Sequence, residues 1–144
     1  MQDLFPFTWQ EELEMAVRLL AAGLFGGAIG WERESAEKPA GVRTLALVSI
    51  GAALFTVVSA MAFEGDADPT RIASTVVTGI GFIGGGVIFR TGLTVIGLTT
   101  AATIWTAAAI GMASGAGMYF ISFFATVLVV GVLRLLPKSP SGGG

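Results

Sequence analysis

The chain of 144 residues contains neither cysteine nor histidine. The absence of cysteine excludes disulfides and thiol chemistry, and the absence of both residues excludes zinc sites built on them. Histidine is also the most common general acid–base residue. The sequence shows no nucleophile–base pair and no cluster of metal ligands. We therefore expect a protein that is not an enzyme and that carries no cofactor.

Charge is scarce as well. Charged residues make up 12% of the chain and hydrophobic residues 53%, whereas a soluble domain typically carries about 25% charged residues. The net charge is only −2, and the eight basic residues are scattered along the chain. They form no patch that would follow a phosphate backbone, so nucleic acid is not an expected partner.

The charges that are present leave four long gaps, at residues 19–31, 44–63, 72–89 and 91–133. A helix needs about 20 mostly apolar residues to cross the hydrocarbon core of a bilayer. The last gap is too long for one helix, because 43 residues would extend roughly 65 Å, about twice the thickness of that core. We therefore predict an all-α, polytopic transmembrane bundle of about five spans.

The expected helices follow from caps, glycines and prolines. They run from the N-cap Thr8 to about Trp31, from Arg43 to about Phe63, from Thr70 or Arg71 to Phe89, and over about 97–113 and 117–135. We expect residues 1–136 to form a single transmembrane domain, with 137–144 as a flexible C-terminal tail.

The basic residues predict the orientation. With five spans, one side of the membrane receives six basic residues and the other side only two. Cytoplasmic loops carry the excess of lysine and arginine. The N-terminus is therefore expected outside and the C-terminus in the cytoplasm, in a multi-pass membrane protein.

Glycine pairs four residues apart recur along the chain, as at Gly26/Gly30 and Gly111/Gly115. Such small residues let membrane helices approach closely, which favours tight packing within the bundle over docking of a partner. A homodimer is our expectation on the same grounds. The run Gly79–Gly86, with five glycines in its eight residues, is denser still. We favour a very tight helix crossing there, over a local unwinding that would expose carbonyls to an ion.

A charged motif follows the first span. Glu32 and Arg33 lie so close to its glycine-rich end that we expect them to be partly buried. Arg43 and Arg90, at the ends of two later helices, are expected to close a network with them. This network is either a salt-bridge clasp that joins helix ends, which we favour, or a regulatory or ion-linked site.

Two further features could bind an ion. Thr99, Thr103 and Thr106 share one helix face and could line a polar track, unless their hydroxyls bond their own helix. The loop 64–68 carries three carboxylates that could hold Mg²⁺ weakly, although an acidic, solvated loop is the preferred interpretation.

These motifs resemble the MgtC/SapB family of bacterial inner-membrane proteins, from about Gly23 to Gly117. The resemblance is carried by Gly30-x-Glu32-Arg33-Glu34, by Gly41-x-Arg43-Thr44, by Arg71-Ile72-Ala73, by the run Val76–Gly86, by Gly97–Trp105 and by Ala108–Gly111. It implies links to magnesium homeostasis, growth at low magnesium, acid resistance and, in pathogens, survival inside host cells. It also implies a regulator that acts on other membrane machinery, including the ATP synthase in some members, although members were first suspected of transporting Mg²⁺.

Two departures from the family pattern are visible. Virulence-associated members carry a cytoplasmic C-terminal domain similar to ACT regulatory domains, and we expect only the N-terminal membrane domain here. Such members also carry Asn and Cys where this chain has Thr99 and Thr106.

Our functional hypothesis is therefore a non-enzymatic regulator that binds other membrane proteins through its glycine-rich faces. The alternative is a transporter or channel for Mg²⁺ or another small ion. The residues expected to carry the function are Gly30, Glu32, Arg33, Glu34, Gly41, Arg43, Thr44, Arg71, Gly79, Gly81, Gly84, Gly86, Arg90, Gly97, Thr99, Thr100, Thr103 and Trp105.

Overall fold

A computed structural model describes residues 7–61 and 70–136. Five helices and one short hairpin are formed by these residues: α1 (Trp9–Ser35), α2 (Val42–Met61), α3 (Thr70–Gly85), β1 (Phe89–Thr91), β2 (Thr94–Ile96), α4 (Leu98–Gly115) and α5 (Tyr119–Leu135). The predicted all-α class is confirmed for the described residues, apart from the hairpin.

Helix α1 begins where its sequence predicts. Thr8 adopts an extended conformation and forms a reciprocal capping box with Glu11. The helix ends at Ser35, one turn later than expected. Glu32 and Arg33 therefore belong to the last turns of a helix, where the prediction placed them in a loop.

The expected end of α3 at Phe89 is wrong. The helix ends at Gly85, and β1 and β2 then pair antiparallel in the register Phe89↔Ile96 and Thr91↔Thr94. Two residues separate the strands, and the first of them, Gly92, has a φ of 62°. Glycine at that position between β-branched residues is a hairpin signal, which the search for apolar spans passed over.

The last two helices agree with the prediction. Leu98–Gly115 and Tyr119–Leu135 replace the expected 97–113 and 117–135. Gly117 reverses the chain between them with a φ of 78°, a left-handed conformation that glycine adopts without a steric penalty.

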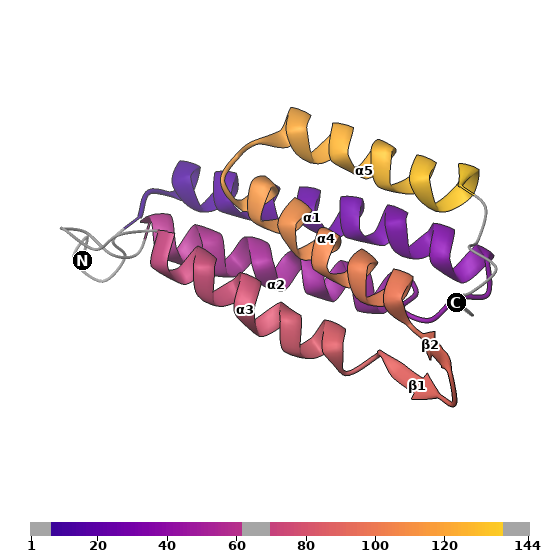
Figure 1. Cartoon of the computed structure of the whole chain (residues 1–144). Coiled ribbons are helices and arrows are strands. Elements are labelled where there is room, and N and C mark those ends of the chain that lie inside the picture. The colour runs from indigo at the N-terminus through magenta and orange to yellow at the C-terminus, as the bar shows by residue number, and fades with distance from the viewer. Residues whose placement is uncertain (1–6, 62–69, 137–144) are drawn as a thin grey trace.

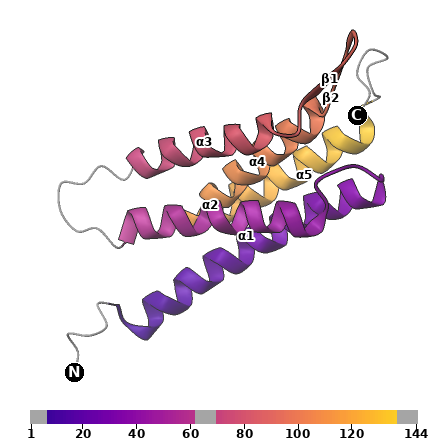
Figure 2. The same cartoon turned by 90° about the horizontal axis from the view of Figure 1, so that it is seen from below.

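Helix α4 lies at the centre of the bundle and contacts each of the other four helices. Figures 1 and 2 show α1, α2 and α5 around it, with α3 diverging from α2 on one side. The apolar core is shared by α1, α2 and α4 and consists of Ile29, Leu45, Ile104, Ala107 and Ile110. This core sets the positions of the charged end of α1 and the first turn of α4.

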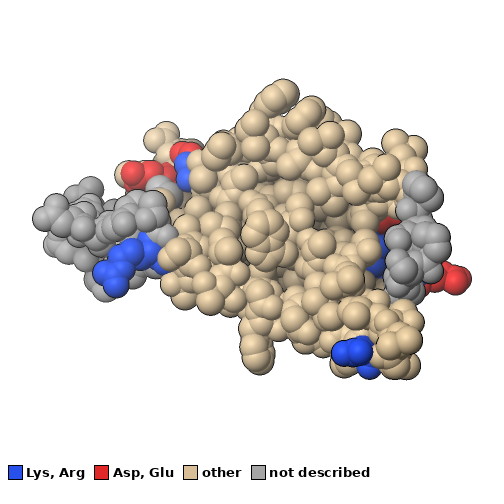
Figure 3. Space-filling model, viewed as in Figure 1, with Lys and Arg blue, Asp and Glu red and all other residues tan. Residues whose placement is uncertain are grey.

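The outer surface of the bundle is apolar along its length. In Figure 3 the charged side chains gather at the two ends of the molecule, and the belt between them on this face is uncharged. Large apolar side chains are exposed on the helices, among them Leu24 of α1 at 72% and Phe82 of α3 at 87%. Two helices are long and apolar enough to cross a membrane by length and composition alone, Trp9–Ser35 and Val42–Ala60.

Candidate functional site

Glycines bring α1 and α4 onto the backbone of α2. A Cβ atom at Gly26 would lie 2.6 Å from Cβ of Ser49, and one at Gly111 would lie 2.8 Å from the carbonyl carbon of the same Ser49. A real side chain almost never approaches this closely, so only glycine permits these contacts. The expected tight packing of glycine-rich helices is therefore confirmed for α1, α2 and α4.

The turn between α1 and α2 is built from the charged motif. A Cβ at Gly30 would lie 2.5 Å from Cα of Val42, so Gly30 lets the first residue of α2 rest on α1. The carboxylate of Glu34 accepts a hydrogen bond of 3.2 Å from the backbone N–H of Val42. A Cβ at Gly41 would lie 2.7 Å from that same carboxylate. Gly30, Glu34 and Gly41 thus have a structural role at the start of α2.

Two neighbouring charged residues of α1 are buried beside this turn. Glu32 is 6% exposed, Arg33 4% and Thr100 of α4 2%. Nη2 of Arg33 donates a hydrogen bond of 2.9 Å to the hydroxyl of Thr100, the third residue of α4. We call Glu32, Arg33 and Thr100 the buried polar cluster. The expected burial of Glu32 and Arg33 is confirmed, and it is nearly complete.

The buried polar cluster is only partly satisfied. Oε2 of Glu32 and Nε of Arg33 are buried and have no hydrogen-bond partner among the described residues. Adjacent residues on a helix do not face each other, so the carboxylate and the guanidinium cannot form a well-aligned pair. Arg33 also places a positive charge at the N-terminus of α4, where the helix dipole favours a negative one. Such a cluster costs stability, as functional sites often do.

The expected network with Arg43 and Arg90 is wrong. Arg43 is exposed on the first turn of α2. Arg90 is exposed on the hairpin, and its Nε donates a hydrogen bond of 3.0 Å to the carbonyl of Gly92. The hairpin separates Arg90 from α1, which the prediction of an uninterrupted helix could not reveal.

Sequence reasoning missed the role of Arg18. Its Nη1 donates a hydrogen bond of 3.0 Å to the carbonyl of Gly115, in the last turn of α4, and its guanidinium also pairs with Glu14. A cation at a helix C-terminus satisfies free carbonyls and complements the helix dipole. Arg18 and Arg33, both on α1, therefore contact the two ends of α4.

The threonines of α4 form no continuous polar track. Thr99 is exposed, whereas Thr103 is buried. The hydroxyl of Thr103 donates to the carbonyl of Thr99 at 2.7 Å, and that of Thr106 donates to Ala102 at 2.8 Å. These hydroxyls are satisfied within their own helix, which was the alternative that the sequence left open.

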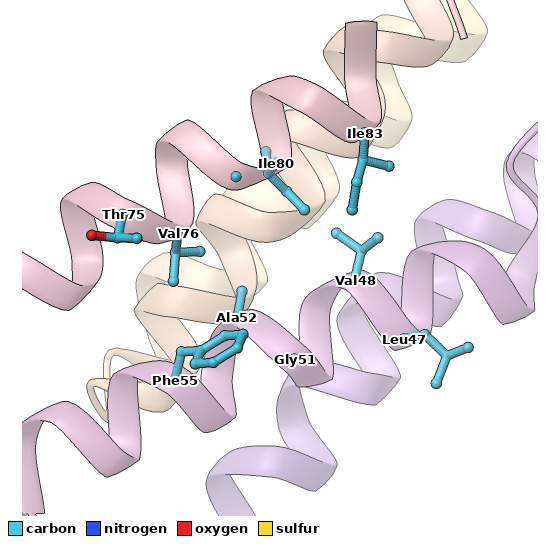
Figure 4. Close-up of a pocket in the computed structure, with 10 residues that line it drawn as sticks. Leu47, Val48, Gly51, Ala52, Phe55, Thr75, Val76, Ile80 and Ile83 are labelled. Atoms are coloured by element: carbon cyan, nitrogen blue, oxygen red, sulfur yellow. The ribbon is translucent and has the colours of Figure 1, made fainter. Parts of the chain in front are cut away.

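A groove opens between α2 and α3. Its volume is about 750 Å³, and Figure 4 shows Val76, Ile80 and Ile83 of α3 projecting toward α2, with Val48 and Ala52 of α2 projecting toward α3. One polar side chain lines it, that of Thr75, whose hydroxyl donates to the carbonyl of Arg71 at 2.9 Å. We call this the α2–α3 groove. Its lining residues are Leu47, Val48, Gly51, Ala52, Phe55, Thr75, Val76, Gly79, Ile80 and Ile83.

The glycine run of α3 forms neither of the arrangements that we expected. The chain is helical up to Gly85, so the helix does not unwind within the glycine run before that residue. A Cβ at Gly79, Gly81 or Gly85 would meet no atom within 4 Å, and one at Gly84 would lie 3.5 Å from the carbonyl of Ala101. The run therefore makes no tight crossing within the described chain. The physical reason is that α3 contacts both α4 and α2, but of these four glycines only Gly84 faces a neighbouring helix closely.

The remaining residues of the predicted site are dispersed. Thr44, Arg71 and Trp105 are exposed on three different helices, and Gly86 is exposed just after α3. Gly97, at the N-cap of α4, has a φ of 87°. The predicted set therefore does not form one site. It divides into the turn and buried polar cluster, the glycines of α3 and scattered surface positions.

No metal site is visible among the described residues. Within residues 7–61 and 70–136, no group of three or more carboxylates lies close enough to hold a metal ion. The acidic loop 64–68, where we considered weak Mg²⁺ binding, lies outside the described residues.

The chain belongs to the MgtC family, whose family model matches residues 19–140. It is 46% identical over 128 residues to Protein MgtC of Brucella abortus, which covers 89% of this chain and 53% of that protein. Putative magnesium transporter YhiD of Escherichia coli K12 is 45% identical over 129 residues, or 85% of this chain and 60% of the relative. An uncharacterized protein of Synechocystis, slr0014, is 45% identical over 132 residues, or 91% of this chain and 55% of the relative.

The chain spans only about half of the length of these curated relatives, between 53% and 60%. No solved structure matches it. Membership of the family is thus shown, and the activity, substrates and partners of the whole protein are matters for proposal.

Proposed function

We propose that this protein regulates magnesium or other ion homeostasis, and adaptation to stress, by binding other proteins of the bacterial inner membrane. Family membership supports the link to magnesium, because one relative is named a putative magnesium transporter. The proposed role is that of a non-enzymatic regulator, which needs a binding surface for a partner within the membrane.

The proposed membrane arrangement has five spans, with the N-terminus outside and the C-terminus in the cytoplasm. The uncharged belt of Figure 3 supports it, as do the large apolar side chains exposed on the helices. The basic residues support the orientation, because five spans place six of the eight on one side.

The observation that carries the regulator proposal is the unfilled surface of α3. Glycine in a helix costs about 1 kcal/mol relative to alanine, yet Gly79, Gly81 and Gly85 contact nothing that would exclude a Cβ. Gly51, on the facing helix α2, is open in the same way. Glycines on a membrane helix allow another helix to approach closely. The α2–α3 groove therefore offers an incoming helix an apolar surface with one open glycine on each wall, Gly51 on α2 and Gly79 on α3.

The groove does not have the chemistry of an ion pathway. Its one hydroxyl is already bonded to its own helix, and helices α2 to α5 carry no carboxylate. Mg²⁺ requires oxygen ligands and gives up its water reluctantly. The open groove thus suits an apolar partner better than a cation.

The regulator proposal is tested by filling the groove. In Gly79→Leu we expect a folded protein that no longer supports growth at low magnesium and no longer co-purifies with its membrane partner. Gly131→Leu is the matched control, because Gly131 on α5 is also open, and a Cβ there would have no atom within 4 Å. Equal function of the two variants would contradict the proposal.

A homodimer is a second proposal, through the open face of α3 that carries Gly81, which does not line the α2–α3 groove. Single cysteines can be introduced freely, since the chain has none. Cross-linking of Gly81→Cys in membranes, without cross-linking of Gly131→Cys, would support a dimer through α3. Cross-linking at neither position would contradict it.

A transporter remains the competing function, and the buried Oε2 of Glu32 is the observation in its favour. Purified protein in liposomes distinguishes the two. The regulator proposal expects no saturable Mg²⁺ flux. Saturable Mg²⁺ uptake that is lost in Glu32→Gln would contradict the regulator proposal and support a transporter.

A further inference from the structure

The two chain segments at the base of the β1–β2 hairpin pack closely against each other. A Cβ at Gly97 would lie 2.9 Å from the carbonyl carbon of Val87, so the chain entering the hairpin presses directly on the chain leaving it. Figures 1 and 2 show the hairpin leaving the end of the bundle where α4 begins, on the side of α3. In both views it points away from the other helices. The hairpin is therefore closed tightly at its base, and all six residues of its strands are exposed.

The tip of this hairpin is unusually apolar. Leu93, in the turn, is 96% exposed, and the apolar surface continues to the base of the strands, where Phe89 is 60% exposed and its partner Ile96 36%. The second position of a tight two-residue turn is normally taken by glycine or a small polar residue, so turn chemistry does not explain a leucine there. A two-stranded hairpin on its own is at best marginally stable in water. A single exposed leucine would need no explanation, but a continuous set of exposed apolar side chains on so short a hairpin indicates contact with an apolar medium.

The polar groups of the hairpin limit how deep that contact goes. Both strands have unpaired outer edges, because the sheet contains only β1 and β2. Unpaired backbone groups are not tolerated in the hydrocarbon region. Arg90 bends back to the carbonyl of Gly92, and Thr91 and Thr94 add hydroxyls beside the turn. An apolar tip framed by an arginine and hydroxyls fits the boundary between headgroups and acyl chains.

We propose that the β1–β2 hairpin is an interfacial anchor that inserts Leu93 and Phe89 into the bilayer surface at this end of the bundle. The partner is the lipid interface, and the arginine contacts its phosphate groups. The alternative of another protein adding a strand is disfavoured, because the strands are only three residues long and offer few hydrogen bonds. The proposal rests on the membrane arrangement proposed above.

Single cysteines in this cysteine-free chain test the anchor in lipid nanodiscs. Leu93→Cys reports on the tip, Ser35→Cys on an exposed polar position at the same end, and Leu20→Cys on an apolar position that is 67% exposed on α1. Each thiol is reacted with a membrane-impermeant maleimide. A fluorescent label on it is then quenched by spin-labelled lipids or by aqueous iodide.

We expect Leu93→Cys to react about tenfold or more slowly than Ser35→Cys, as the transfer of a leucine-sized group from water implies. Its label should be quenched by spin labels near the headgroups. The label at Leu20 should be quenched by deep spin labels, and the one at Ser35 by iodide.

Two results at the tip would overturn the anchor. Fast reaction together with iodide quenching would mean that the hairpin lies in water. Slow reaction without quenching by lipid would mean that a protein covers it. If the label at position 20 is quenched by lipid in either case, only the proposed hairpin anchor is contradicted. If neither position is quenched by lipid, the proposed membrane arrangement fails as well.

Discussion

Glycines of α1 and α4 lie against the backbone of α2, whereas those of α3 face open space. Gly26 and Gly111 lie so close to Ser49 that a methyl group at either position would overlap it. Gly79 and Gly81 have no atom within 4 Å of a Cβ position. The two groups look alike in the sequence, and the α3 run is the denser of them. Glycine spacing thus indicates that a close contact is possible, but not which surface makes it.

The polar side chains of the two regions differ in the same way. Arg33 and Thr100 form a buried hydrogen bond between α1 and α4. On α3, by contrast, the hydroxyls of Thr75 and Thr78 are exposed and bond carbonyls of their own helix. Polar side chains therefore join helices to one another in the α1–α2–α4 region. On α3 the two threonines bond only the backbone of their own helix.

The largest effect is expected from Gly111→Ala. The added methyl group would overlap the backbone of Ser49, which cannot move as a flexible side chain can. Such overpacking costs about 3 kcal/mol or more. Thermal unfolding in detergent should show a large loss of stability, with Gly131→Ala as the control because that site is open. Similar unfolding temperatures for the two variants would contradict the difference between the packed glycines and the open ones.

A smaller effect is expected from Thr100→Val, which keeps the shape of the side chain and removes its hydroxyl. Arg33 would lose its bond to Thr100 and stay buried, at a cost of about 1–3 kcal/mol. Thr78→Val on α3 is the matched control, since its hydroxyl is exposed. Chemical unfolding of both variants measures the difference. An equal loss in both would show that the buried polar cluster adds nothing specific.

The smallest effect, and one of opposite sign, is expected from Gly79→Ala. The methyl group has free space around it, and alanine is the better helix former by up to about 1 kcal/mol. The purified protein should therefore unfold at the same temperature as the wild type or slightly higher. Marked destabilisation of the monomer would mean that α3 packs more tightly within the chain than the structure shows.

Much of this architecture could be predicted from where charge is missing. The gaps between charged residues located four of the helices closely, and the capping box at Thr8 located the start of α1. The hairpin was missed because β-branched apolar residues fit a membrane helix and a strand equally well. Only Gly92 distinguishes the two, and a single glycine is weak evidence in a chain with 21.

The site was harder to predict, for a different physical reason. Burial of Glu32 and Arg33 could be predicted, because a charge next to a glycine-packed helix end has little access to water. Their partners could not, since the contact of Arg33 with Thr100 joins residues 67 positions apart. The openness of the α3 glycines was equally hidden, because it depends on how far α3 diverges from α2.

Arg18 and Arg33 constrain the number of residues that α1 can have between them. One reaches the last turn of α4 and the other its first turn, so the length of α1 between them must match the length of α4. Inserting a single residue between them would advance one arginine by about 1.5 Å and rotate it by about 100° relative to the other. Both contacts could not then survive. The segment 19–32 must therefore keep its residue count if both arginines are to reach α4.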